Sequence, residues 1–350
     1  MIKPRLLALA LLPGLCAAPF ARAATPRFHV AGQIALPGPV KWDYLATDPA
    51  AHRIFAAQGD RVDVIDTRTQ RRIGTIGNVR GTHGIALAPR FGHGFATAGI
   101  AGTVTMFDLK TLRTIRTIDV GRGPDGIAYD PSSRLVLVPN EVSQTLFAID
   151  PANGRIVGSL PFHADPEFIV ADGRGRVYLN LKSANRIAVI DPRAMTILRE
   201  IDVAPACTGP TGLAIDRADM RLFVSCRNDV LAVVDARGGK VVASLPLPGF
   251  ADAVRYDARD ALVLAPSIDG TLSIVRASPK DGSGDEYRVI QRLGTAPGAR
   301  TLTFDATTRT AYLSTAKQVG MLPPAPGKTY PRRAFKPGSF HVLVVRASAP

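Results

Sequence analysis

The chain has 350 residues, of which 46% are hydrophobic and 21% are charged, and its formal net charge is +14. This composition is typical of a folded globular protein, and the length fits one large domain or two small ones. The 32 glycines and 28 prolines exclude an architecture of long helices and favour many short elements joined by turns.

The N-terminal residues 1–23 are expected to be a secretory signal peptide. A basic start, MIKPR, precedes an apolar run, LLALALLPGLCAAPF, that is too short and too interrupted to span a bilayer. The small-x-small triplet at residues 21–23 predicts cleavage after Ala23. We therefore expect a mature protein of residues 24–350, without a membrane span, in the periplasm or outside the cell.

Cleavage would also remove Lys3, Arg5 and Arg22, which leaves 40 basic and 29 acidic residues and a formal charge of +11. Such an excess favours anionic partners, including nucleic acid and polymers of the cell envelope. However, Lys and Arg never form a run longer than two, and no basic stripe carries interleaved aromatic residues. DNA or polyanion binding is therefore an alternative hypothesis and not the first one.

A phrase of two strand-like runs around a turn recurs through the chain. It reads TDPAAHRIFAA in its first copy and YDPSSRLVLVP in its third. The seven copies are anchored at Asp48, Ala88, Asp130, Asp172, Asp216, Asp257 and Asp305, with steps of 40 to 48 residues. The alternation of the flanking runs and their β-branched residues predict a strand on each side of every turn.

A second phrase, such as VDVIDTRTQRRIGTI or LFAIDPANGRIVGSL, follows each anchor and adds two further strands. Four strands in a unit of about 42 residues are typical of a propeller blade, so seven copies predict seven blades. The last copy stops after its third strand at Val345, and RFHVAGQIAL near the N-terminus resembles the missing fourth strand. We predict an all-β, seven-bladed β-propeller that is a single domain and whose ring is closed by the N-terminal strand.

The glycines Gly121, Gly123 and Gly126 match the G-x-G-x-x-G outline of a dinucleotide-binding loop. Such a loop must open a helix, whose N-terminus holds the pyrophosphate. Here a predicted outer strand precedes the glycines and a predicted inner strand follows them. We therefore interpret them as turn residues between two blades.

Several phrases carry a family resemblance, among them KWDYLATDP, HGIALAP, GPTGLAID, RLFVSCRN and GSFHVLVV. Over residues 28–345 the chain resembles the YncE-like, YVTN-repeat family of secreted bacterial β-propellers. Its architecture is also similar to that of quinoprotein amine dehydrogenase and lactonase-like propellers. The resemblance implies a fold and an export route, and DNA binding as an alternative, but it implies little about chemistry.

One position recurs five residues before each anchor, where the chain enters the innermost strand. The seven residues at this position are Asp43, His83, Asp125, Glu167, Thr211, Asp252 and Arg300. Because propellers bind ligands at the mouth of the central channel, we expect these side chains to form a ligand-binding ring there.

Two interpretations of this ring stay open. Asp43, His83, Asp125, Glu167 and Asp252 are candidate ligands of a divalent metal ion, the one cofactor that the sequence suggests. Crowded carboxyl groups also favour acid–base chemistry, and a metal-assisted hydrolase or lactonase-like enzyme is the alternative. In the simpler interpretation the polar groups only solvate the channel and pair with one another. No residue is assigned a catalytic role.

Two further features concern the loops. The Pro-rich, basic segment 316–338 interrupts the last blade, either as a lid over the channel mouth or as a plain surface loop.

Cys207 and Cys226 are the only cysteines of the mature chain, and folding the hairpin between them predicts a disulfide.

Taken together, the sequence predicts a monomeric, secreted propeller that binds a small ligand or an envelope protein at its channel mouth, and it favours a binding module over an enzyme.

Overall fold

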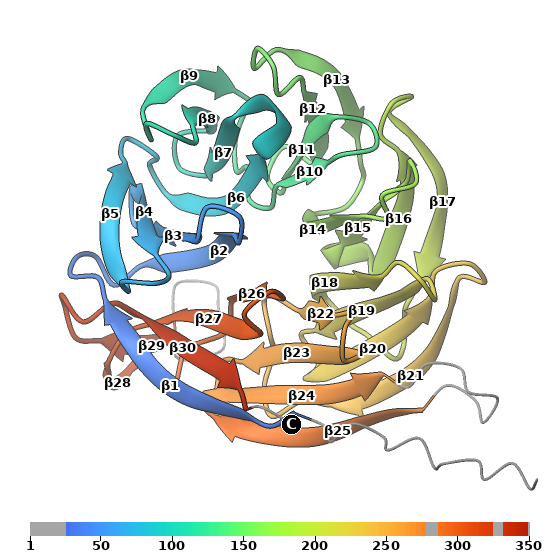
Figure 1. The fold of residues 1–350 in the computed structure, drawn as a ribbon. Helices are drawn as coiled ribbons and strands as arrows, with labels where there is room; N and C mark the ends of the chain where they lie inside the picture. Colours follow the sequence, from blue (N-terminus) through green and yellow to red (C-terminus); the bar gives the residue numbers. More distant parts are fainter. Residues whose placement is uncertain (1–25, 278–285, 325–331, 349–350) are drawn as a thin grey trace, which may run out of the picture.

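The structure is a computed structural model and describes residues 26–277, 286–324 and 332–348 (Figure 1). The predicted signal peptide therefore lies outside the described residues. Within them, helical structure is limited to two 3-10 turns, Pro89–Phe91 and Lys182–Ala184. None of the helical segments in these ranges is long and apolar enough to cross a membrane.

Seven four-stranded antiparallel sheets surround a central axis, which confirms the predicted seven-bladed propeller (Figure 1). Six blades use four consecutive strands, numbered from the innermost outwards. Blade 1 is β2 (Trp42–Asp48), β3 (Arg53–Gln58), β4 (Arg61–Asp66) and β5 (Arg71–Ile76); blade 2 is β6 (Thr82–Ala88), β7 (His93–Ala98), β8 (Thr103–Asp108) and β9 (Thr114–Asp119). Blade 3 is β10 (Ala128–Asp130), β11 (Leu135–Asn140), β12 (Thr145–Ile149) and β13 (Ile156–Pro161); blade 4 is β14 (Pro166–Ala171), β15 (Val177–Leu181), β16 (Arg186–Asp191) and β17 (Thr196–Asp202). Blade 5 is β18 (Pro210–Asp216), β19 (Arg221–Cys226), β20 (Val230–Asp235) and β21 (Lys240–Pro246); blade 6 is β22 (Arg255–Asp257), β23 (Leu262–Ser267), β24 (Thr271–Ala277) and β25 (Tyr287–Gly294).

The seventh blade joins the two ends of the chain. Its strands are, from the inside outwards, β26 (Leu302–Asp305), β27 (Thr310–Thr315), β30 (His341–Ala347) and β1 (Phe28–Ala35). β1 pairs with β30 from Phe28 opposite Ala347 to Ala35 opposite His341. The predicted closure of the ring by the N-terminal strand is therefore confirmed.

The hydrophobic core lies between neighbouring blades, so that both faces of each sheet are covered. In β3, for example, Ile54 and Phe55 point to opposite faces and are both fully buried. The Phe55 ring lies 5.9 Å from that of Phe107 in the next blade. This two-sided burial explains why the middle strands are almost uninterrupted runs of apolar residues.

The outer strand of every blade contains a β-bulge at the same place. The extra residues, which the pairing register skips, are Ile73, Ile115, Val157, Leu198, Val242, Ile290 and Ala31. Bulges bend an edge strand and interrupt its pairing capacity, so this recurring feature protects the outer edges from further strand addition.

Arginines tie successive blades together near the outer turns. The Arg53 guanidinium donates a hydrogen bond to the Leu109 carbonyl of the next blade at 2.6 Å, and Arg116 donates to the Asn153 carbonyl at 2.8 Å. Much of the excess positive charge thus lies on side chains that also bind main-chain oxygens.

The segment inserted in the last blade contains two strands that pair as a hairpin. β28 (Gln318–Leu322) pairs with β29 (Arg332–Phe335), and residues 325–331 between them lie outside the described residues. At its base Phe335 packs edge-on against Trp42, with ring centroids 4.8 Å apart. This contact holds the hairpin next to the innermost strand of blade 1.

The glycines of the G-x-G-x-x-G outline lie in the connection between β9 and β10. Gly121 and Gly123 have φ values of 75° and 76°, a conformation that favours glycine, and a strand follows them instead of a helix.

The predicted disulfide between Cys207 and Cys226 is present. It ties the loop before β18 to the end of β19, and both residues are completely buried.

Replacing both cysteines (Cys207→Ala with Cys226→Ala) should lower the free energy of unfolding by about 3 kcal/mol, because a crosslink over such a short loop restricts the unfolded chain. The separation is 19 residues. Urea denaturation of the oxidised parent and of the double variant measures the difference. An unchanged midpoint would contradict a stabilising role.

Candidate functional site

The seven residues of the recurring position lie at or just before the innermost strands. Asp43, His83, Glu167 and Thr211 are in β2, β6, β14 and β18, whereas Asp125, Asp252 and Arg300 directly precede the strands of their blades. The structure brings them together as three local groups and not as one even ring.

The first group is centred on His83. Its Nδ1 lies 2.5 Å from Asp43 Oδ2 and 3.5 Å from Asp125 Oδ1. Burial alone would lower the pKa of His83, but the hydrogen bond to Asp43 and the charges of both carboxylates outweigh it and raise the pKa to about 9. A Cβ atom on Gly99 would lie 2.7 Å from the imidazole, so glycine is required there for the ring to fit.

The second group surrounds Lys182, which directly follows β15. Its ammonium group donates hydrogen bonds to Glu141 Oε1 at 2.5 Å and to the carboxylate of Glu167. Burial and the neighbouring charge of Asp125 raise the pKa of Glu167 to about 8, against the opposing effect of Lys182. Burial likewise raises the pKa of Asp125 to about 7.

We call these six residues, Asp43, His83, Asp125, Glu141, Glu167 and Lys182, the acidic cluster. Four carboxyl groups face only two cationic groups. Protons bound to Asp125 and Glu167 offset part of the surplus negative charge. Because the pKa values of these two groups are about 7 and about 8, the cluster gains and loses protons near neutral pH.

Parts of the acidic cluster have the arrangement of a metal site. Two sets of three residues bring possible ligand atoms within 4.8 Å of one another. The first set is Asp43, His83 and Asp125, and the second is Asp125, Glu141 and Glu167. Each set already has a cationic partner, Lys182 in the second and protonated His83 in the first, so a divalent cation in the first set would have to displace a proton from His83. The fifth predicted ligand, Asp252, is in neither set.

The third group is the ion pair between Asp252 and Arg300. The charge of Asp252 is the main effect that raises the pKa of Arg300 against the opposing effect of burial. This pair belongs to the opposite side of the mouth, where the other charged side chains are arginines.

Thr211 is completely buried and binds the main chain of neighbouring strands. Its hydroxyl donates to the carbonyl of Ala251 in the next blade at 2.6 Å, and Asn180 donates to the Thr211 carbonyl at 2.7 Å. In blade 5, therefore, the residue at the recurring position links neighbouring blades through hydrogen bonds and does not face the channel mouth.

The channel is closed below the mouth by side chains from non-adjacent blades. Tyr44 of β2 and Phe168 of β14 meet edge-on with centroids 5.2 Å apart, and the Arg255 guanidinium of β22 lies 5.5 Å from the Phe168 ring. Figure 1 shows β2 and β14 on opposite sides of the central opening. The contact therefore narrows the channel next to Asp43 and Glu167, which directly precede Tyr44 and Phe168 in the sequence.

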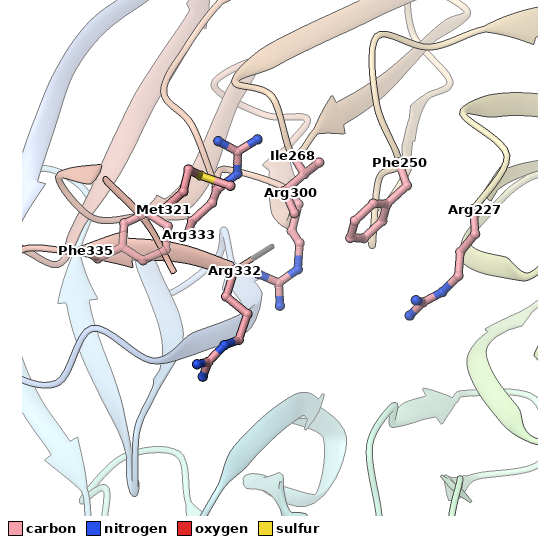
Figure 2. A pocket seen from close by; sticks show the side chains of 9 residues that line it. Arg227, Phe250, Ile268, Arg300, Met321, Arg332, Arg333 and Phe335 are labelled. Atoms are coloured by element: carbon pink, nitrogen blue, oxygen red, sulfur yellow. The ribbon is translucent and has the colours of Figure 1, made fainter. Parts of the chain in front are cut away.

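A cavity of about 550 Å³ lies beside the acidic cluster, and we call it the arginine pocket. Its lining is Arg227, Phe250, Ile268, Gly298, Arg300, Met321, Arg332, Arg333 and Phe335. Figure 2 shows Arg227 and Phe250 on one side and the hairpin residues Met321, Arg332 and Phe335 on the other.

Three of the four guanidinium groups in this pocket have no carboxylate partner among the described residues. Arg333 donates to the Gln318 side chain at 2.8 Å, and Arg332 donates to the Pro323 carbonyl at 3.1 Å. Arg227 lies 5.5 Å from the centre of the Phe250 ring. Only Arg300 is neutralised, by Asp252.

A second cavity of about 210 Å³ adjoins the arginine pocket and shares Arg300 and Phe335 with it. Trp42, Asp43 and His83 also line it. The Trp42 indole N–H is buried and has no acceptor among the described residues. An acceptor group of a ligand would satisfy it.

The sequence analysis missed Glu141, Lys182 and Arg227. Each of them directly follows the second strand of its blade. This position recurs as regularly as the position five residues before each anchor, on which the prediction of the ring was based. Aligning the repeats at the end of the second strand would have identified them, since loops from both positions converge on the mouth.

No family model matches the chain, and no curated protein matches it. Three solved structures are similar: hydrazine synthase of Kuenenia stuttgartiensis, U3-55K and the WD40 repeats of RRP9, with TM-scores of 0.67, 0.73 and 0.75. The sequence identities are 17%, 11% and 11%; the alignments cover 79%, 90% and 93% of this chain and 92%, 98% and 100% of those chains. At these identities the comparisons support the propeller fold alone.

The acidic cluster should make the protein less stable as the pH rises. The pKa values of Asp125 and Glu167 in the folded protein, about 7 and about 8, exceed those of unfolded carboxyl groups, so the folded state binds extra protons. This contribution is complete below about pH 4 and is lost as the pH passes through these values. The raised pKa of His83 acts in the same direction.

We expect the melting temperature to fall between about pH 5 and pH 9, and Asp125→Asn to flatten the profile because an amide does not titrate there. Asp119→Asn, on an exposed outer strand, is the matched control. A profile unchanged by Asp125→Asn would contradict the assignment.

Proposed function

We propose that the protein is a binding module that recognises an anionic group with an apolar body in the arginine pocket. The observation that carries this proposal is that three arginines without carboxylate partners among the described residues line one cavity. Guanidinium groups bind carboxylates and phosphates through two parallel hydrogen bonds, and they do so more strongly where water is partly excluded.

The apolar lining supports the second half of the proposal. Phe250, Ile268, Met321 and Phe335 supply the hydrophobic surface that binding sites for organic ligands usually have. The unsatisfied Trp42 N–H in the adjoining cavity offers one further donor.

Export to the periplasm, or out of the cell, belongs to this proposal. The disulfide supports it, since such bonds persist mainly in oxidising compartments. Membership of the YncE-like family is likewise proposed, on the motifs quoted above, and it agrees with the propeller fold.

A second candidate function is metal-assisted hydrolysis at the acidic cluster, favoured by the ligand atoms of Asp43, His83 and Asp125. A divalent cation there would polarise a substrate bound in the adjoining cavity. We expect calorimetric titration with Zn²⁺ or Mn²⁺ to give one site that Asp43→Asn removes. The exposed variant Asp119→Asn should titrate like the parent. Heat that is the same in all three proteins would eliminate this candidate.

The main proposal is tested with benzoate, which carries a carboxylate on an apolar ring, and with neutral benzamide as the matched probe. Benzoate should bind, and the double variant Arg332→Gln with Arg333→Gln should weaken it roughly tenfold, about 1.4 kcal/mol, because two charged donors are lost. Isothermal titration calorimetry measures both affinities.

The control is Arg113→Gln with Arg155→Gln, which removes two exposed arginines outside the mouth and should leave benzoate binding unchanged. Equal affinity for benzoate and benzamide, or equal loss in both double variants, would sink the proposal.

A further inference from the structure

The hairpin at the arginine pocket has a strand with one unpaired edge. Among the described sheets, β28 pairs only with β29. Three of its five residues, Val319, Met321 and Leu322, are large apolar residues that are 60%, 51% and 43% exposed. None of the five is charged. An exposed, uncharged edge strand is a template for a further strand.

This edge differs from the outer edges of the seven blades. Five of those seven edges carry basic residues, such as Arg71 and Arg72 in β5 and Lys240 in β21. All seven contain a bulge, including β13 and β1, which carry no Lys or Arg. β28 contains one irregularity at Val319, after which Gly320, Met321 and Leu322 pair in regular register with β29. The protein thus protects most of its outer edges with charge and all of them with a bulge, whereas β28 carries no charge.

The surroundings of β28 define the chemistry of a partner strand. Met321 lines the arginine pocket together with Phe250 and Ile268, and Arg227, Arg332 and Arg333 bring positive charge without carboxylate partners among the described residues. Side chains of an extended chain point alternately to opposite sides. A segment that alternates acidic and apolar residues would therefore meet both kinds of surface.

We propose that the arginine pocket binds an extended, acidic segment of a partner protein, whose main chain pairs with the free edge of β28. The carboxylates of the segment bind Arg227, Arg332 and Arg333, and its apolar side chains pack on Met321 and Phe250. The inference rests on the proposed function and narrows it to one class of partner. Five residues of β28 span about 16 Å, which is enough to pair with a segment of similar length.

The test uses three labelled nonapeptides with blocked ends. The first alternates Glu and Val. The second has the same sequence with N-methyl groups on three consecutive central residues, which removes the main-chain donors on both edges. The third replaces Glu by Lys. Fluorescence polarisation measures the affinities. The first should bind at least tenfold more tightly than each of the others, and Arg332→Gln with Arg333→Gln should weaken it.

Hydrogen exchange of backbone amides distinguishes strand pairing from charge attraction, because attraction between charges alone would not slow the exchange of the β28 amides. The first peptide should slow exchange of the amides of residues 318–322 without protecting β9, an outer strand that carries Arg116. If the N-methylated peptide binds equally well, or if no peptide binds although benzoate does, the inference is wrong and anion binding still stands. If benzoate also fails to bind, the proposed function is wrong as well.

Discussion

The site at the channel mouth depends on hydrogen bonds that fix the chain at the start of the innermost strands of blades 1, 3 and 6 to the neighbouring blade. The Thr97 hydroxyl donates to the Asp125 carbonyl at 2.7 Å, the Thr211 hydroxyl to the Ala251 carbonyl, and the Thr301 hydroxyl to the Asp43 carbonyl at 2.9 Å. These bonds are buried or partly buried, so losing one would leave an unsatisfied polar group. These bonds therefore fix the main chain at Asp43 and Asp125 and directly before Asp252, whose side chains lie at the mouth.

A firmly held ring allows charges to be kept close together. Carboxyl oxygens of Asp125 lie within 4.8 Å of a carboxyl oxygen of Asp43 and of Glu167. His83, Lys182 and bound protons relieve the repulsion between these groups. On the other side of the mouth the imbalance has the opposite sign, because Arg300 alone has an acidic partner. The mouth is thus divided into an acidic and a basic side, with the Tyr44–Phe168 contact closing the channel beneath them.

The high positive charge of the chain is not evenly available to partners. Several outer arginines bind carbonyl groups of the next blade, as Arg53 and Arg116 do, and so stabilise the ring. Many aspartates instead accept hydrogen bonds from the amides of their own turns, as Asp66 and Asp130 do. Net charge by itself therefore identifies no ligand. The arginines of the pocket differ because their neighbours are mostly apolar.

The sequence by itself determined the number of blades, the closure of the ring and the disulfide, because strand alternation, turn residues and repeat spacing are local or periodic features. It also predicted one position per blade at the mouth. Only the tertiary structure decided what each of those residues does. Thr211 is buried in the ring, whereas Lys182 and Glu141 join the acidic cluster from a second position. Contacts such as Tyr44 with Phe168, and the hairpin beside the arginine pocket, arise between segments far apart in the chain, and no local pattern encodes which side chains will face each other across the axis.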